Sequence, residues 1–220
     1  MPLDQDNEAA GQDAAPVTAT ALRRDLQLIA DMIEPESRVL DIGCGDGALL
    51  DYLSREKNVD GRGIEISQEG VNACVANGLS VIQGAADTDL ANYPANAFDY
   101  VVLGQTLQAT HRPRLVLEDL VRIGRHAVVS FTNFGHWRTR LSLMVRGRAP
   151  VRSGTVYGWY DSPDIHLCTI LDFVWLSNAL GLTIEKGLSL GRDGGTRVIR
   201  SAGHLENLLG EQAIFLLRQG

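Results

Sequence analysis

The chain has 220 residues, and 27 acidic residues against 20 lysines and arginines give it a formal net charge of −7. This acidity argues against general binding to nucleic acids, whose phosphates attract basic surfaces. The three cysteines lie apart without metal-ligand spacing, so we expect reduced core residues and no metal site. The length suits one α/β domain, and the absence of a signal peptide and of a long apolar run predicts a cytoplasmic protein without membrane contact.

Residues 1–20 are rich in small and polar residues, so we expect a disordered tail. Residues 21–220 are expected to form the domain, which starts with an amphipathic helix from Leu22. The stretch Val39–Ile42 then predicts a buried strand, and glycines at every second position from Gly43 to Gly47 predict a turn that leads into a helix. Such a turn lets a ligand lie against the main chain, beside the free N–H groups at the helix start.

Two ligand classes compete for this turn. Gly43–Ala48 formally fits the GxGxxG/A pattern of dinucleotide-binding enzymes. Asp41–Gly47 fits DxGxGxG, which resembles the first motif of class I S-adenosylmethionine-dependent methyltransferases. Asp41 favours the second class, because a carboxylate can bind the ammonium group of that cofactor but would repel a pyrophosphate. A strand–turn–helix without a ligand is the third interpretation. The predicted contacts with S-adenosylmethionine, or with S-adenosylhomocysteine, are Asp41, Gly43, Cys44, Gly45 and Gly47.

Glu65 is the next candidate for cofactor binding. It lies about twenty positions beyond the glycines, near the end of a predicted strand over Val59–Ile66. Its two carboxylate oxygens can accept hydrogen bonds from both ribose hydroxyls, and the adjacent Ile66 is assigned to the same site. The alternative is a surface glutamate beside a helix that starts after Ser67, a probable N-cap by residue type.

An acid after the third strand is the candidate for the adenine. A helix over Gln68–Asn77 and a strand over Ser80–Gln83 precede Asp87. In the methyltransferase fold such an acid often accepts a hydrogen bond from the adenine amino group, so we assign Asp87 to the cofactor. Asp89 is the alternative residue for this contact. The other interpretation is that the acid is a solvated loop residue without a ligand.

The fourth strand, Phe98–Leu103, leads to the crevice where open α/β sheets bind ligands. Gly104 is assigned to the cofactor, and Gln105, Thr106 and Gln108 could line the side of a methyl acceptor. His111 is the nearby group suited to proton transfer near pH 7, although loop histidines are more often solvated. No catalytic residue is assigned.

The remaining elements complete an α/β order. We expect a class I methyltransferase fold, which is Rossmann-like and doubly wound, with a seven-stranded, mostly parallel sheet whose last two strands form an antiparallel edge pair. The chain from Gly191 to Gly203 is expected to be a mobile loop. The predicted helices are Leu115–Ile123, with Pro113 near its start, and Thr169–Leu180, and the predicted strands are His126–Phe131, Leu182–Leu190 and Gln212–Arg218.

The segment 133–168 is unusually long for a connection inside one domain. It holds two of the three tryptophans and five arginines in an otherwise acidic chain. Trp, Tyr and Arg often anchor protein interfaces, which makes this aromatic and basic insertion a candidate docking surface. Binding of single-stranded nucleic acid and packing of the aromatic residues on the sheet are the alternatives.

Four stretches together resemble one family. They are Val39–Gly47, Gly104–Gln108, Ser130–Arg138 and Trp159–Cys168, and with them residues 20–220 resemble the MetW-type methionine biosynthesis proteins. The FGHWR and WYDxPxIHLC parts are far more specific than the glycine motif, which many methyltransferases share.

The resemblance implies a role beside another enzyme. The family has the methyltransferase fold and acts with a homoserine O-acyltransferase of the α/β-hydrolase type. We therefore expect a protein that binds S-adenosylmethionine and supports that acyltransferase, with acetyl or succinyl transfer, homo-oligomer formation and methyl transfer of its own left open. A genuine methyltransferase for an unidentified small molecule and an NAD-dependent oxidoreductase are the other hypotheses.

Overall fold

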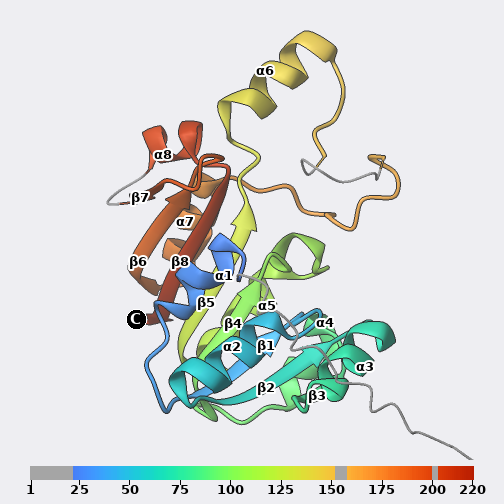
Figure 1. Cartoon of the computed structure of the whole chain (residues 1–220). Helices are drawn as coiled ribbons and strands as arrows, with labels where there is room; N and C mark the ends of the chain where they lie inside the picture. Colours follow the sequence, from blue (N-terminus) through green and yellow to red (C-terminus); the bar gives the residue numbers. More distant parts are fainter. Residues whose placement is uncertain (1–21, 152–157, 200–202) are drawn as a thin grey trace, which may run out of the picture.

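The computed structural model describes residues 22–151, 158–199 and 203–220. The predicted N-terminal tail, residues 1–20, lies outside the described residues. Strands and helices alternate through most of the chain (Figure 1). In chain order the elements are α1 (Arg24–Ala30), β1 (Arg38–Ile42), α2 (Ala48–Lys57), β2 (Asp60–Glu65), α3 (Gln68–Ala76), β3 (Ser80–Gln83), α4 (Ala86–Asp89), β4 (Phe98–Gly104), α5 (Pro113–Ile123), β5 (Gly124–Thr132), α6 (Trp137–Arg146), α7 (Ile170–Ala179), β6 (Leu182–Leu190), β7 (Thr196–Val198), α8 (His204–Leu209) and β8 (Gln212–Gln219).

All strands of the described chain join one sheet, in the order β3-β2-β1-β4-β5-β8-β6-β7. The neighbours from β3 to β5 pair in parallel, and β8, β6 and β7 pair antiparallel. Successive strands run outward on both sides of β1, which is the doubly wound arrangement with a switch point between β1 and β4. The predicted class I methyltransferase fold is confirmed, with one strand more than expected.

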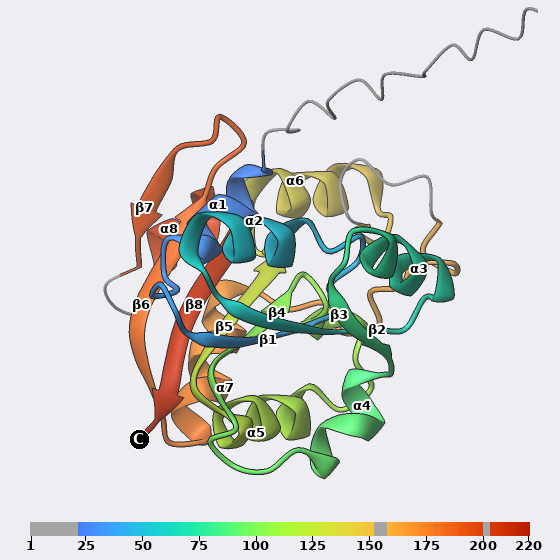
Figure 2. The same ribbon diagram turned by 60° about the horizontal axis from the view of Figure 1, so that its bottom comes forward.

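Helices cover both faces of the sheet (Figure 2). Because side chains alternate along a strand, neighbouring residues of β1 enter different cores. Val39 packs with residues of α1 and α2, whereas Leu40 packs with residues of α5 and α7. The apolar run that predicted this strand is therefore apolar because both of its faces are buried.

The extra strand, β7, lies in the segment that we expected to be a mobile loop. Gly191 N donates to Gly195 O at 2.9 Å, and Gly194 has a φ of +77°, so the chain turns back tightly. Thr196–Val198 then pairs with the end of β6, Leu190 opposite Thr196. The predicted antiparallel pair of β6 and β8 is confirmed, but β7, and not β6, forms the edge of the sheet.

The predicted insertion contains α6, which stands away from the sheet (Figure 1). None of the residues of α6 is buried. After the gap at 152–157 the chain returns to the core at α7, whose start is fixed by a reciprocal capping box between Thr169 and Asp172. Among the helices of the described ranges, none has the length and apolar character needed to cross a bilayer.

Candidate functional site

The glycine-rich loop between β1 and α2 lies at the carboxyl ends of the parallel strands. Gly43 N and Cys44 N donate to Ile64 O of β2 at 2.7 and 3.3 Å, which ties the loop to the neighbouring strand. Gly43, Gly45 and Gly47 have φ values of +74°, +58° and +82°. These lie in the left-handed region that favours glycine, so the predicted strand, glycine turn and helix are confirmed.

The site glycines serve different purposes. A Cβ at Gly43 would lie 2.5 Å from Thr106 Oγ1, and one at Gly47 would collide with a leucine methyl group. At Gly45 and at Gly104, an added Cβ would have nothing within 4 Å. Gly43 and Gly47 therefore allow close packing, whereas Gly45 and Gly104 border open space where a ligand can approach the main chain.

Glu65 ends β2 and is only 8% exposed, so it is not a surface acid. Its Oε2 accepts a hydrogen bond from Gly45 N at 2.8 Å, and its Oε1 accepts one from Ser67 N at 2.9 Å. Since each carboxylate oxygen has two acceptor positions, both oxygens keep one for a ligand hydroxyl. The adjacent Ile66 is 69% exposed and offers an apolar surface beside them.

Asp41 is a buried carboxyl group without a donor. It is 4% exposed, and within the described residues no hydrogen bond to its carboxylate is formed. Burial, with the Glu65 carboxylate as the smaller cause, raises the pKa of Asp41 to about 7. A ligand cation at this position would stabilise the ionised form.

Cys44 directs its side chain into the core. Its Sγ lies 4.0 Å from Cys74 Sγ, in a small cluster with Leu50 beneath the glycine loop. Burial is the largest cause that raises the pKa of both thiols, so both stay protonated at neutral pH. A contact between Cys44 and a cofactor would therefore come from its backbone.

Two acids follow β3, and both hold backbone in place. The Asp87 carboxylate accepts hydrogen bonds from His111 N at 2.9 Å and from Arg112 N at 3.0 Å. Asp89 Oδ2 accepts one from Ala85 N at 2.7 Å. Neither is a free loop acid. The adenine contact of Asp87 stays a prediction, and any such contact would share the carboxylate with these amides.

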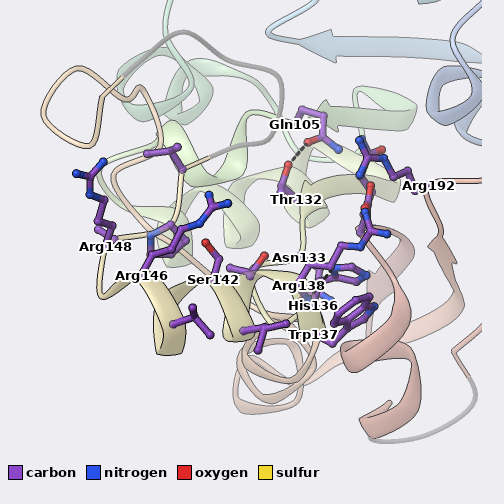
Figure 3. A pocket seen from close by; sticks show the side chains of 18 of the residues that line it. Gln105, Thr132, Asn133, His136, Trp137, Arg138, Ser142, Arg146, Arg148 and Arg192 are labelled. Carbon is purple, nitrogen blue, oxygen red and sulfur yellow. Dashed lines mark hydrogen bonds between the residues drawn. The ribbon is translucent and has the colours of Figure 1, made fainter.

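The residues expected beside a methyl acceptor fall into two groups in the structure. Thr106 packs against the glycine loop, and Gln108 is 1% exposed, with Nε2 donating to Thr132 O at 3.0 Å. Gln105 and Thr132, linked at 3.1 Å, line a cavity of about 1570 Å³ between the strand ends and α6 (Figure 3). This cavity could not be predicted from the sequence, because α6 forms one wall and lies far along the chain.

Comparison with known proteins decides the family. A family model described as methionine biosynthesis protein MetW matches residues 23–217. The chain belongs to the MetW family. The bifunctional methionine biosynthesis protein MetXA/MetW of Rhodopirellula baltica is 32% identical over 186 residues, which are 80% of this chain and 30% of that protein. The chain thus spans less than a third of this relative's length.

Solved structures show the same fold at low sequence identity. A methyltransferase from Thermotoga maritima, described as S-adenosylmethionine-dependent and a possible histamine N-methyltransferase, has a TM-score of 0.66 at 15% identity and covers 90% of this chain and 88% of its own. The [4+2]-cyclase SpnF has a TM-score of 0.62 at 20% identity and covers 89% and 80%. Since one of these structures of the same fold is a cyclase, the fold alone does not determine a reaction.

Near the end of β5, in the MetW motif, Asn133 connects three segments of the chain, a role that was not predicted from the sequence. Asn133 is 1% exposed, and its Nδ2 donates to the carbonyls of Asn207 and Gly210, both at 2.8 Å. Its Oδ1 accepts from Gly135 N at 3.0 Å and from Ile170 N at 3.2 Å. This one amide joins the insertion, α7 and the segment before β8. Motif residues alone could not predict it, because the partners are distant in the sequence.

Only Trp137 and Arg138, which end the MetW motif, lie at the surface. His136 is buried and caps α6 by accepting from Arg138 N at 3.4 Å, and its burial lowers its pKa. Trp137 is 41% exposed, and the Arg138 guanidinium lies 5.2 Å from its ring centroid. The alternative that the aromatic residues of the insertion pack on the sheet does not hold for Trp159, which is 74% exposed, although Phe134 is buried.

One pentapeptide, Gly187–Gly191, formally fits the GxSxG pattern of α/β-hydrolase nucleophiles. That pattern carries the nucleophile only at a sharp strand-to-helix turn. Here Ser189 lies within β6, is 2% exposed and pairs opposite Ala213 of β8. Its Oγ donates to Arg197 O at 3.5 Å. In this MetW-family chain the pentapeptide is therefore part of a regular β-strand and does not form a nucleophile turn.

Proposed function

We propose that this chain binds S-adenosylmethionine, or S-adenosylhomocysteine, at the glycine loop. The observation that carries the proposal is Asp41, a buried carboxyl group without a hydrogen-bond donor in the described chain. The ammonium group of the cofactor would supply the missing partner. Glu65 would bind the ribose hydroxyls, and the main chain at Gly45 would border the cofactor. Ile66, Asp87 and Gly104 would surround its remaining parts.

Two features weigh against a dinucleotide in the same place. Gly45 N, which would be needed for a pyrophosphate, already donates to Glu65 at 2.8 Å. The Asp41 and Glu65 carboxylates would also face the negative phosphates at close range. Calorimetry with S-adenosylmethionine, S-adenosylhomocysteine and NAD tests this assignment. Tight binding of NAD together with no response to either sulfur nucleoside would overturn it.

We further propose that the chain supports a homoserine O-acyltransferase of the α/β-hydrolase type. Family membership and the relative named MetXA/MetW support this role. The buried, mid-strand Ser189 offers no exposed nucleophile, which fits a supporting protein better than an acyltransferase. Co-purification from cells and acyltransfer assays with and without the chain test the role, and the release of S-adenosylhomocysteine in the same assay reports methyl transfer.

The insertion offers the surface for this partner. On α6, Leu143 is 50% exposed and Met144 is 77% exposed, and neither lines the cavity. Trp159 and Tyr160, also in the insertion, are 74% and 73% exposed. We call these four residues the insertion surface. Because residues 133–151 include arginines and no acid, the matching partner surface would be an apolar groove with an acidic rim.

A further inference from the structure

The cavity beneath α6 is lined by residues other than those of the glycine loop. Its volume of about 1570 Å³ exceeds the 300–1,000 Å³ of most small-molecule sites. Its walls come from the ends of β4 and β5, the start of α1, the inner face of α6 with residues 148–151 that follow it, the turn between β6 and β7, and the start of β8 with the residue before it (Figure 3). On α6 that face consists of residues three and four positions apart, which share one side of a helix. We call this space the arginine cavity, after the lining residues Arg23, Arg138, Arg146, Arg148 and Arg192.

The positive charge of the arginine cavity is largely unpaired. Arg23 forms a two-point contact with Asp25, at 3.2 and 2.9 Å, so this pair is neutral. Glu211 is the other acid among the described lining residues, and His136 adds no charge because its pKa is lowered by burial. In the part of the chain that the structure describes, no ion pair involves Arg138, Arg146, Arg148 or Arg192.

The arginines form two groups. Arg138 and Arg192 lie on one side of the cavity, and Arg146 and Arg148 lie on the other (Figure 3). Arg138 and Arg146 are eight positions apart on one helix, which is about 12 Å along its axis. Each guanidinium presents a fork of donors that suits a carboxylate or a phosphate.

The wall between the two groups is polar. Ser142 lies on the inner face of α6 between the arginines, and Gln105 and Thr132 lie opposite (Figure 3). Gln212, at the start of β8, also lines the cavity.

We propose that the arginine cavity binds a small molecule with an anionic group, a carboxylate or a phosphate, at each end. One end binds Arg138 and Arg192, and the other binds Arg146 and Arg148. The chain as a whole carries a net charge of −7, so the attraction is local to this cavity and not a property of the whole surface.

Calorimetry on the chain alone, at low salt and without S-adenosylmethionine, tests the proposal. The phosphate probes are fructose 1,6-bisphosphate and its one-ended counterpart, fructose 6-phosphate. The carboxylate probes are adipate and the one-ended hexanoate. We expect the better two-ended probe to bind at least about tenfold more tightly than its one-ended counterpart, since a second charge-assisted contact contributes on that scale. The stronger series identifies the anionic group.

Paired variants test the location. Arg138→Gln with Arg192→Gln, and separately Arg146→Gln with Arg148→Gln, should each weaken two-ended binding about tenfold. The matched control is Arg55→Gln with Arg114→Gln, which also removes two exposed charges but on α2 and α5. If a double variant fails to fold, Arg192→Gln and Arg146→Gln alone carry the comparison.

Three results would overturn the proposal. They are equal binding of one-ended and two-ended probes, an equal loss in the control variant, and the absence of binding at millimolar concentrations. If the cavity variants weaken only the binding of the acyltransferase, the arginines belong to the partner interface instead. The cofactor and partner proposals are tested by different ligands, so a failure here leaves them intact.

Discussion

Asp41 makes stability depend on pH in a direction opposite to that of a paired carboxylate. Its pKa is raised from 3.8 to about 7. Below pH 4 the group is protonated in both the folded and the unfolded state. Between pH 4 and 7 it ionises only in the unfolded state, so stability falls as the pH rises, and above pH 7 no further change follows. In Asp41→Asn this loss should disappear. Urea unfolding without ligand should therefore show a difference in unfolding free energy, between the variant and the unsubstituted chain, that grows from pH 4 to 7. A constant difference would contradict the assigned cause.

The same group predicts how cofactor binding depends on pH. If the ammonium group requires ionised Asp41, affinity for S-adenosylmethionine should rise up to about pH 7, by about tenfold per unit well below that value. It should then level off until the cofactor's own ammonium group loses its proton. Asp41→Asn should bind weakly and without this rise. Calorimetry between pH 5.5 and 8 checks both expectations, and a parallel rise in the variant would exclude Asp41 as the source.

Gly43 and Gly45 form a matched pair of positions. Both have positive φ, so alanine costs about 1–2 kcal/mol of strain at either. At Gly43 the new Cβ also meets Thr106 Oγ1 at 2.5 Å, whereas at Gly45 it meets nothing. Gly43→Ala should therefore lower the melting temperature more. Gly45→Val should lose cofactor binding, because its side chain enters the open space. Circular dichroism must first show that this variant is folded, since a β-branched residue at positive φ is strained. Full affinity of folded Gly45→Val would mean that the cofactor lies elsewhere.

Glu65 serves both the loop and the proposed ribose contact. Glu65→Ala should weaken nucleoside binding by on the order of 2–3 kcal/mol, because two charge-assisted hydrogen bonds are lost. It should also destabilise the glycine loop, since Gly45 N and Ser67 N lose their acceptor. Stability must therefore be measured first. Glu65→Gln, which keeps one acceptor oxygen, is the control, and unchanged affinity in both variants would remove the ribose role.

At the scale of elements, α6 stands out because none of its residues is buried, its apolar side chains included. Met144→Asp should leave the melting temperature unchanged, because Met144 is 77% exposed, and should weaken acyltransferase binding by at least about 1–2 kcal/mol if it is an anchor. Trp159→Ala should behave alike. Leu115→Asp is the matched control, because Leu115 is an exposed apolar residue on α5, outside the insertion. Pull-down and acyltransfer assays measure the effect, and full binding by both folded variants would place the interface elsewhere.

The central strands were predictable because their own residues determine them. Apolar runs such as Val39–Ile42 are buried on both faces, and the bounds of the parallel strands were correct to within about two residues. The strand β7 was not predictable, because Thr196–Val198 is short, exposed and held only by pairing with β6. Asn133 and the arginine cavity were missed for the same reason. Both depend on contacts between segments that only the folded chain brings together.

At the scale of the whole molecule, the proposed cofactor and partner sites lie on connected elements. The glycine loop ends β1, and the insertion begins at the end of β5 in the same sheet. If S-adenosylmethionine changes affinity for the acyltransferase by some factor, the acyltransferase must change affinity for S-adenosylmethionine by the same factor. We expect a factor of at least about 5, the low end of typical couplings. Titrations in both directions check the equality, and no change in either direction would mean that the sites act independently.

The position of β8 determines the order in which a newly made chain can complete its fold. β8 lies between β5 and β6, although β6 and β7 precede it in the sequence. By residue 132 the ribosome has made all five parallel strands, and with them the glycine loop. β6 and β7 are synthesised next, but they can join the sheet only after residues 212–219 have formed β8 between β5 and β6. Until that moment the nascent chain presents an open β5 edge, the kind of surface on which mispairing starts and chaperones act.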